Sequence, residues 1–193
     1  LPAFFQPFPF AVTAFASALE MLSDHPVLRP PRSNEIIPLL SPLYARDVDK
    51  IADEIEENIA AGYRTVKIKL GADVDHELAR VRAAQVAGGG RLLLRLDANQ
   101  RYTRDEALKF VTGLDSEAIE LLEQPCDADD WDSAIEVRKA ASVPLMLDES
   151  IYGPEDIVKT AELSAADYVK LKLMKFSTLD RLMDGISMAG KQG

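Results

Sequence analysis

TVKIKL (residues 65–70) shows the alternation of a half-buried β-strand more clearly than any other stretch of the chain. Val66, Ile68 and Leu70 occupy one face, and Lys67 and Lys69 occupy the other. Because successive side chains of a strand point to opposite faces, the apolar set is expected to pack against helices. A lone Lys-x-Lys pair is most often a solvated strand, so its meaning depends on the sequence around it.

Strand-like and helix-like segments alternate on both sides of this stretch. Further apolar runs predict strands at 36–40, 92–96, 119–122, 144–147 and 168–172. Amphipathic patterns predict helices at 47–61, 75–86, 131–141 and 154–163, and a last helix from about Thr178. Thr103 and Glu106 form a capping box that predicts one more helix, running to about Thr112. This order predicts an α/β fold in which helical crossovers join parallel strands.

Two architectures have this order of elements, an open doubly wound sheet and a closed barrel. No Gly-x-Gly-x-x-Gly follows the first predicted strand, and no Gly-x-x-x-x-Gly-Lys-Ser/Thr phosphate loop occurs. The sequence therefore favours a (β/α)8 TIM-type barrel, of which about six βα units are present. Residues 1–34 differ from the rest, since prolines flank a single short helix at about 11–22. We expect them to form a separate segment before a barrel domain at 35–193.

Charged and polar residues recur at the C-terminal ends of the predicted strands, where the active site of a parallel barrel gathers. About one βα unit separates each set from the next, so they fall at equivalent places: Lys67 and Lys69, Asp97 and Asn99, Glu123, Asp148 and Glu149, Lys170 and Lys172. Their common register predicts that they converge on one mouth of the barrel. The lysines are then expected to point inward and serve a site.

The three carboxylates of this set, Asp97, Glu123 and Asp148, would repel one another unless a cation neutralised them. An all-oxygen set of ligands suits a hard divalent cation, and Mg²⁺ is the usual one. A lysine close to other positive charges has a lowered pKa and can act as a general base. Removal of a proton next to a carboxylate creates an enediolate, which a metal and nearby ammonium groups stabilise. The pattern predicts Mg²⁺-dependent proton transfer.

Five segments together resemble the enolase superfamily, specifically its muconate lactonizing enzyme subgroup, the mandelate racemase/muconate lactonizing enzyme-like proteins. They are VKIKLG at 66–71, RLDANQ at 95–100, EQP at 123–125, DES at 148–150 and KLMK at 172–175. The resemblance implies that residues 1–34 are a remnant of an N-terminal α+β capping domain with the helix that leads into the barrel. Strands seven and eight of the family's barrel are also missing, so we expect these parts to be disordered, removed or supplied by another chain, and we expect the chain to begin inside a larger protein.

The resemblance also implies a role for each residue of the set. The acid/base catalysts on opposite sides of the site would be Lys69 and Lys172, and Lys67 would hold the substrate carboxylate or tune Lys69. The Mg²⁺ ligands would be Asp97, Glu123 and Asp148. Supporting roles would fall to Asn99, Glu149 and Lys170. Lys170 is a departure from the family, many of whose members have an uncharged residue there. It gives strand six its own Lys-x-Lys pair, which would favour an anionic substrate or a lower pKa of Lys172.

Composition excludes several classes of partner. The 193 residues include 32 acidic and 22 basic side chains, and the net charge of −10 argues against nucleic acid. No apolar run approaches the roughly 20 residues of a membrane helix, and the first residues, LPAFF at 1–5, lack the basic region typical of a signal peptide. The single cysteine, Cys126, and two distant histidines give neither a disulfide nor a zinc site and fit a cytoplasmic protein. We expect a small-molecule carboxylate as substrate and a homo-oligomer.

The leading hypothesis for function is racemisation or epimerisation of an amino-acid-type or related carboxylic acid. Lysines on opposite strands can each reach one face of a planar enediolate, which suits this reaction. Cycloisomerisation and dehydration share the same first step and stay open. Two hypotheses of other classes are a Schiff-base aldolase, in which a strand-six lysine forms an imine, and an inactive fragment.

Overall fold

The computed structural model describes residues 8–29 and 36–192. The chain divides into two compact units. One unit comprises Ile37–Ser150 and Ser164–Tyr168, and we call it the sheet unit. The other comprises the described parts of Leu1–Ile36 and Val169–Gly193 together with Ile151–Leu163, and we call it the helical unit. The predicted boundary at residue 34/35 falls outside the described residues.

The sheet is parallel, and its strands follow chain order. They are β1 (Ser41–Leu43), β2 (Thr65–Lys69), β3 (Leu93–Asp97), β4 (Ile119–Glu123), β5 (Leu145–Leu147) and β6 (Tyr168–Val169). Each strand from β1 to β4 pairs in parallel with the next. A doubly wound sheet reverses its strand order at a switch point, whereas a barrel adds every strand on the same side. The order β1 to β6 is that of a barrel, so the predicted α/β architecture is confirmed.

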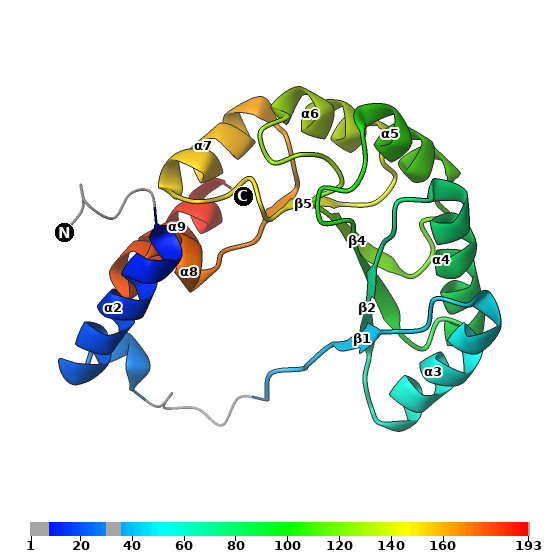
Figure 1. Cartoon of the computed structure of the whole chain (residues 1–193), viewed down its shortest axis with the longest axis horizontal. Helices are drawn as coiled ribbons and strands as arrows, with labels where there is room; N and C mark the ends of the chain where they lie inside the picture. Colours follow the sequence, from blue (N-terminus) through cyan, green and yellow to red (C-terminus); the bar gives the residue numbers. More distant parts are fainter. Residues whose placement is uncertain (1–7, 30–35, 193) are drawn as a thin grey trace. The chain divides into compact units, whose positions relative to one another are not determined.

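Four helices of the sheet unit lie along one face of the sheet, as Figure 1 shows. They are α3 (Val48–Ala60), α4 (Val74–Gly88), α5 (Arg104–Gly113) and α6 (Trp131–Ala140). Val66 and Ile68 of β2, with Leu94 and Leu96 of β3, are fully buried and contribute to the core of the unit. The alternate residues, Lys67 among them, belong to the opposite face of the sheet, as the alternation predicts.

Local signals place the ends of these helices. Thr103 and Glu106 form the predicted capping box at the start of α5, with both reciprocal hydrogen bonds present. The side chain of Asp73 caps α4 by accepting from two backbone N–H groups. Gly89 follows α4 in the left-handed conformation, with a φ of 53°, and ends the helix there. The ends of α4 and the start of α5 therefore follow from local sequence signals.

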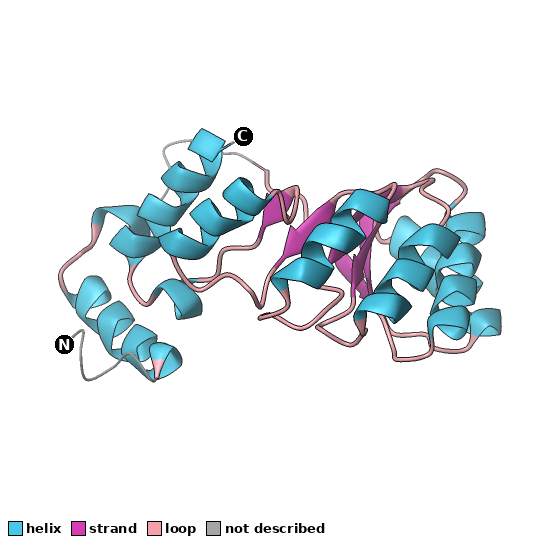
Figure 2. Cartoon of the chain, turned by 90° about the horizontal axis from the view of Figure 1, so that it is seen from above, coloured by secondary structure: helices cyan, strands magenta, loops and turns pink. Residues whose placement is uncertain are grey.

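The described part of the helical unit consists mainly of helices and connecting loops (Figure 2). The elements are α2 (Pro9–Leu22), η1 (Pro26–Leu28), α7 (Pro154–Leu163), α8 (Leu173–Phe176) and α9 (Leu179–Gln192). Thr13 of α2 donates to the carbonyl of Met174 in α8 at 3.1 Å. Glu20 of α2 accepts from the backbone N–H of Leu179 at 2.8 Å, at the start of α9. The N-terminal helix thus packs with C-terminal elements of the chain.

Two predicted strands are wrong in their extent. Residues 36–40 form no strand, and Ile36 is 92% exposed. Pro38 has no N–H to donate to a ladder; pairing begins at Ser41, and Leu43 of the same strand is buried in the core. The strand predicted at 168–172 ends at Val169, and the short helix α8 begins at Leu173. The apolar pattern alone indicated neither limit.

Among the described residues, no helix is long and apolar enough to cross a membrane.

Candidate active site

The register of the parallel strands brings three of the predicted residues side by side. Lys69 at the end of β2 pairs with Asp97 at the end of β3, and Asp97 pairs with Glu123 at the end of β4. Asp148 follows β5 directly, two residues beyond Met146, which is the partner of Glu123. The residues that sequence spacing places at equivalent positions therefore lie along one edge of the sheet.

The three carboxylates at this edge are withdrawn from solvent. Asp97 and Glu123 are each 2% exposed, and Asp148 is 1% exposed. Ionised carboxylates are costly to bury unless a cation or hydrogen bonds compensate their charge. Such a cluster of buried acids is a typical feature of an ion-binding or catalytic site.

Lys67 supplies a positive charge to this cluster. Its Nζ lies 2.7 Å from Asp97 Oδ2 and 2.9 Å from Glu123 Oε2. Burial alone would lower the pKa of Lys67, but the hydrogen bonds and charges of Asp97 and Glu123 outweigh it and raise that pKa above its usual value. A lysine with a raised pKa stays protonated at neutral pH. In this arrangement Lys67 is a cation held between the two carboxylates.

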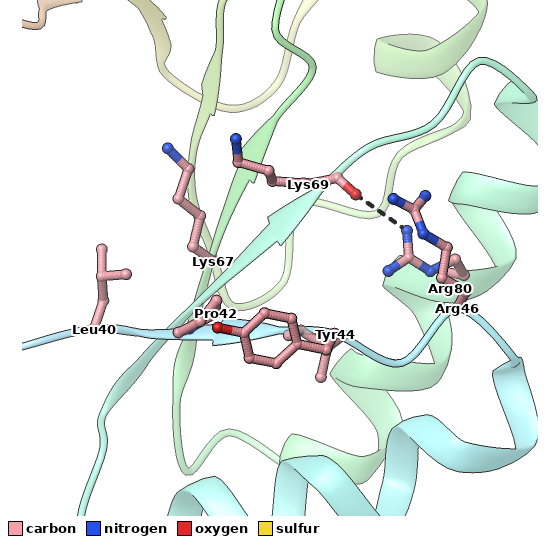
Figure 3. A pocket seen from close by; sticks show the side chains of 8 residues that line it. Leu40, Pro42, Tyr44, Arg46, Lys67, Lys69 and Arg80 are labelled. Atoms are coloured by element: carbon pink, nitrogen blue, oxygen red, sulfur yellow. Dashed lines mark hydrogen bonds between the residues drawn. The ribbon is translucent and has the colours of Figure 1, made fainter.

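Lys69 projects from the same side of β2 as Lys67, as Figure 3 shows. Its side chain is exposed. Both lysines line a cavity of about 520 Å³, whose other walls include Leu40, Pro42 and Tyr44. Lys69 is therefore accessible to a small molecule in this cavity, next to the carboxylates that Lys67 neutralises.

Asn99 and Glu149, predicted as supporting residues, contact each other. Asn99 Nδ2 donates to Glu149 Oε1 at 3.1 Å, and the backbone N–H of Asn99 donates to Asp97 Oδ1 at 3.0 Å. Asn99 adopts a left-handed backbone with a φ of 44°, a conformation that asparagine tolerates better than most residues. This turn binds one oxygen of Asp97 and so helps to fix the orientation of its carboxylate.

Gln124 is a buried residue of the site to which the sequence argument gave no role. Its Oε1 accepts from the backbone N–H of Asp148 at 2.8 Å and of Ser150 at 3.2 Å. Its Nε2 donates to the carbonyl of Cys126 at 3.1 Å and to Ser150 Oγ at 2.9 Å. The side chain thereby ties the end of β4 to the loop that carries Asp148. The only signal in the sequence is the polar residue directly after Glu123, in a segment that reads EQP.

Lys170 and Lys172 belong to the helical unit. Both are half-buried and follow β6, and Lys172 is the N-cap residue of α8. Their predicted positions opposite Lys69 stay a prediction.

The donor set of the sheet unit fits a divalent cation. Asp97 and Glu123, on adjacent strands, already converge on one positive charge, the Lys67 ammonium. Both are buried oxygen donors, the type that Mg²⁺ prefers. Asp148 is equally buried at the end of the next strand. Within residues 8–29 and 36–192, no group of three His, Cys, Asp or Glu side chains is close enough to hold a metal ion. A third ligand therefore requires Asp148 to approach the other two.

Comparisons with known proteins place the chain in a family. Residues 50–193 match the family described as Enolase C-terminal domain-like. The chain is 34% identical over 125 residues to a hydrophobic dipeptide epimerase of Enterococcus faecalis, covering 65% of this chain and 35% of the relative. It is 32% identical over 145 residues to an N-succinyl-L-Arg/Lys racemase of Bacillus cereus, covering 75% of this chain and 39% of the relative. The chain thus spans little more than a third of the length of these curated relatives.

Other relatives include a muconate cycloisomerase of Rhodococcus opacus and a cis-3-hydroxy-L-proline dehydratase of Roseibium aggregatum. Among solved structures, a dipeptide epimerase of Cytophaga hutchinsonii complexed with Mg and the dipeptide D-Ala-L-Val superposes with a TM-score of 0.77 at 25% identity. That match covers 83% of this chain and 44% of the other. The family match covers well over half of the chain, and the strand order agrees with it. The chain belongs to the enolase superfamily, in its muconate lactonizing enzyme subgroup.

Proposed function

We propose that this chain carries the acid/base and metal-binding residues of an enzyme that removes a proton next to a carboxylate, with Mg²⁺ as its cofactor. The observation that carries the proposal is the pair of buried carboxylates, Asp97 and Glu123, on one cation, with the accessible Lys69 beside them. The proposed reaction is racemisation or epimerisation of an amino-acid-type acid.

Asp97, Glu123 and Asp148 are the residues that would hold the metal. When bound, a divalent cation stabilises the negative charge that develops on the substrate carboxylate as the α-proton leaves. Asn99 orients Asp97 through its backbone N–H, and Gln124 holds the backbone of Asp148. These hydrogen bonds restrict the Asp97 carboxylate and the backbone at Asp148, which limits how far the Asp148 side chain must reorganise to join the other two ligands.

Four lysines supply the positive charge and the proton transfer of the proposed reaction. The ammonium of Lys67 contacts Asp97 and Glu123 in the absence of metal; a bound cation would displace it from Asp97, and it would then attract an anionic substrate. Lys69 removes or returns the proton on one face of the planar enediolate. Lys172 acts in the same way on the opposite face, and Lys170 adds a second positive charge near it. Racemisation needs both lysines because the proton leaves from one face and returns to the other.

The relatives support an amino-acid-type substrate. Two of them act on dipeptides or N-succinyl amino acids according to their names. We therefore propose a small carboxylic acid with a nitrogen substituent at the α-carbon. Cycloisomerisation and dehydration begin with the same proton abstraction. Because relatives are named for these two activities, both are second candidates for the reaction. A homo-oligomeric, cytoplasmic enzyme stays a prediction.

The test follows α-proton exchange by ¹H NMR in D₂O. The full-length protein that contains this chain is incubated with a panel of dipeptides and N-acyl amino acids, with Mg²⁺ or with EDTA. We expect Mg²⁺-dependent loss of the α-proton signal with at least one class. Lys69→Ala and Lys172→Ala should each lower the rate by about 10²-fold or more.

The matched control is Lys139→Ala, which removes an exposed lysine of α6 in the sheet unit and should leave the rate unchanged. Exchange that persists in EDTA and in both lysine variants would contradict the proposal. A borohydride-trapped imine on Lys172 without metal dependence would replace it with the Schiff-base aldolase.

A further inference from the structure

Arg80 of α4 is a fully buried cation outside the proposed metal and acid/base set. It is 1% exposed, and its partner Glu77, one turn earlier in α4, is 2% exposed. A buried arginine is rare because its charge must be compensated inside the protein. Replacing a buried ion pair by apolar residues of similar size is often neutral for stability, so stability alone does not explain this pair.

The guanidinium of Arg80 joins three parts of the sheet unit. Its Nη1 donates to the carbonyl of Lys69 at 3.2 Å and to the carboxylate of Glu77. Its Nη2 donates to the carbonyl of Ala45 at 2.9 Å. Figure 3 shows the bond to Lys69, with Arg80 on the opposite side of the backbone from the lysine side chains. Arg80 thus binds the last residue of β2 and the loop after β1 at the same time.

Residues around Arg80 also contribute to this arrangement of β2 and the loop after β1. Glu54 accepts from the backbone N–H groups of Tyr44 at 2.7 Å and Ala45 at 2.6 Å, so the loop after β1 is held from both sides. Gly71 leaves room for Glu77, since a Cβ at this position would lie 2.8 Å from Glu77 Oε1. Among the described residues, Arg80 Nε has no hydrogen-bond partner. One buried donor is left unsatisfied, while Nη1 and Nη2 bind the carbonyl of Lys69 at the end of β2 and that of Ala45 in the loop after β1.

We infer that Arg80 is a positioning residue that fixes the backbone of Lys69 against the loop at Tyr44–Ala45, and with it the placement of the Lys69 amine in the cavity. The inference rests on the proposed function, since it assigns Arg80 to the geometry of that acid/base. Lys69, Tyr44 and Arg80 line the same cavity, and the two carbonyls that Arg80 binds belong to Lys69 and to Ala45, the neighbour of Tyr44. A displacement of about 1 Å at a reacting group lowers a rate by up to about 10²-fold.

The experiment compares Arg80→Met and Arg80→Lys in the full-length protein. Methionine removes every donor, whereas lysine retains the charge for Glu77 but has no planar fork with which to bind both carbonyls. Using enzyme that thermal unfolding shows to be folded, we expect kcat to fall at least about tenfold in both variants, with KM changed less than about threefold. Arg80→Lys should recover stability more than it recovers kcat.

The matched control is Arg91→Met. Arg91 also donates to two backbone carbonyls, those of Gly88 and Ala87, and pairs with Glu56, but it is an exposed residue in the loop after α4. The kcat of the Arg91→Met variant should equal that of the wild type. Unchanged kcat in folded Arg80→Met, or complete rescue by Arg80→Lys, would overturn the inference and leave Arg80 a purely structural residue.

Backbone hydrogen exchange provides a readout that needs no activity. The amides of Tyr44, Ala45 and Leu70 should exchange at least about tenfold faster in Arg80→Lys, while those of α5 and α6 keep wild-type rates. If the wild-type enzyme fails to exchange any substrate α-proton, the proposed function fails. Hydrogen exchange then tests by itself whether Arg80 fixes the backbone of Lys69 against the loop at Tyr44–Ala45. Unchanged protection at Tyr44, Ala45 and Leu70 would overturn it.

Discussion

Replacing Gln124 by leucine should destabilise the protein and weaken its metal site. Gln124 is 1% exposed, and its amide bonds the backbone N–H of Asp148, the backbone N–H and hydroxyl of Ser150 and the carbonyl of Cys126. Leucine keeps a similar volume and removes every polar contact. The left-handed backbone at position 124, with a φ of 38°, disfavours glutamine and leucine alike. The difference in stability between the wild type and Gln124→Leu therefore reports the lost hydrogen bonds.

The magnitude follows from the groups left without partners. The N–H of Asp148 and the carbonyl of Cys126 belong to buried residues, and an unsatisfied buried polar group costs about 1–3 kcal/mol. Two such groups give an expected loss of about 2–6 kcal/mol in the free energy of unfolding. Because the loop of Asp148 loosens, Mg²⁺ affinity should also fall about 10- to 100-fold, as for other partners that orient a ligand.

Urea denaturation measures the first effect, and titration calorimetry with Mg²⁺ measures the second. The matched control is Gln85→Leu, since the Gln85 amide also donates to two backbone carbonyls, those of Asp115 and Glu117, in a more exposed place on α4. Water can replace those bonds, so the control should lose no more than about 0.5 kcal/mol. Equal losses in the two variants, or a Gln124→Leu loss below about 1 kcal/mol, would refute the reasoning.

Three further predictions concern local structure and pH. Thr103→Ala should lower stability by about 1 kcal/mol, since the capping box of α5 is lost, and a thermal melt unchanged by the substitution would contradict this. Gly185→Ala should destabilise α9 despite the better helix propensity of alanine, because a Cβ there would lie 2.5 Å from the ring of the fully buried Phe176; a higher melting temperature would show that the ring can move. Burial, with smaller contributions from Asp130 and Asp127, raises the pKa of the Cys126 thiol to about 11. The unfolded thiol ionises near pH 8.5, so stability is fully present below that pH and declines as the pH rises towards about 11. Urea midpoints from pH 7 to 10 should show this decline in the wild type and less of it in Cys126→Ser.

The arrangement of the sheet and its carboxylates was predictable because two periods in the sequence agree. Alternation along β2 separates Lys67 from Val66 and Ile68, and the structure buries the two apolar residues on the face that packs against the helices. One βα unit separates Asp97 from Glu123, and the strands bring the two into register. A period of two and a repeated unit depend on local sequence alone, so they can be read without knowledge of tertiary contacts.

Features that depend on tertiary partners could not be predicted in this way. The apolar run at 36–40 resembles a strand, yet pairing begins only at Ser41, where the neighbouring strand is available. Gln124 and Arg80 look like ordinary surface residues in the sequence, and their burial follows from backbone groups far along the chain. Lys67 was expected to assist Lys69, and the structure adds that it pairs with Asp97 and Glu123. The resemblance to a family indicated candidate roles for the site residues, whereas only the contacts in the structure show how these residues are arranged.

The most direct test of the site is an anomalous difference map from crystals of the full-length protein grown with Mn²⁺ in place of Mg²⁺. We predict a single peak about 2.1 Å from carboxylate oxygens of Asp97, Glu123 and Asp148. Lys67 Nζ should then have left its 2.7 Å contact with Asp97, because the metal takes over the charge of the carboxylates. A map with no peak at these carboxylates, and with Lys67 still between Asp97 and Glu123, would contradict a metal-dependent proton transfer at this site.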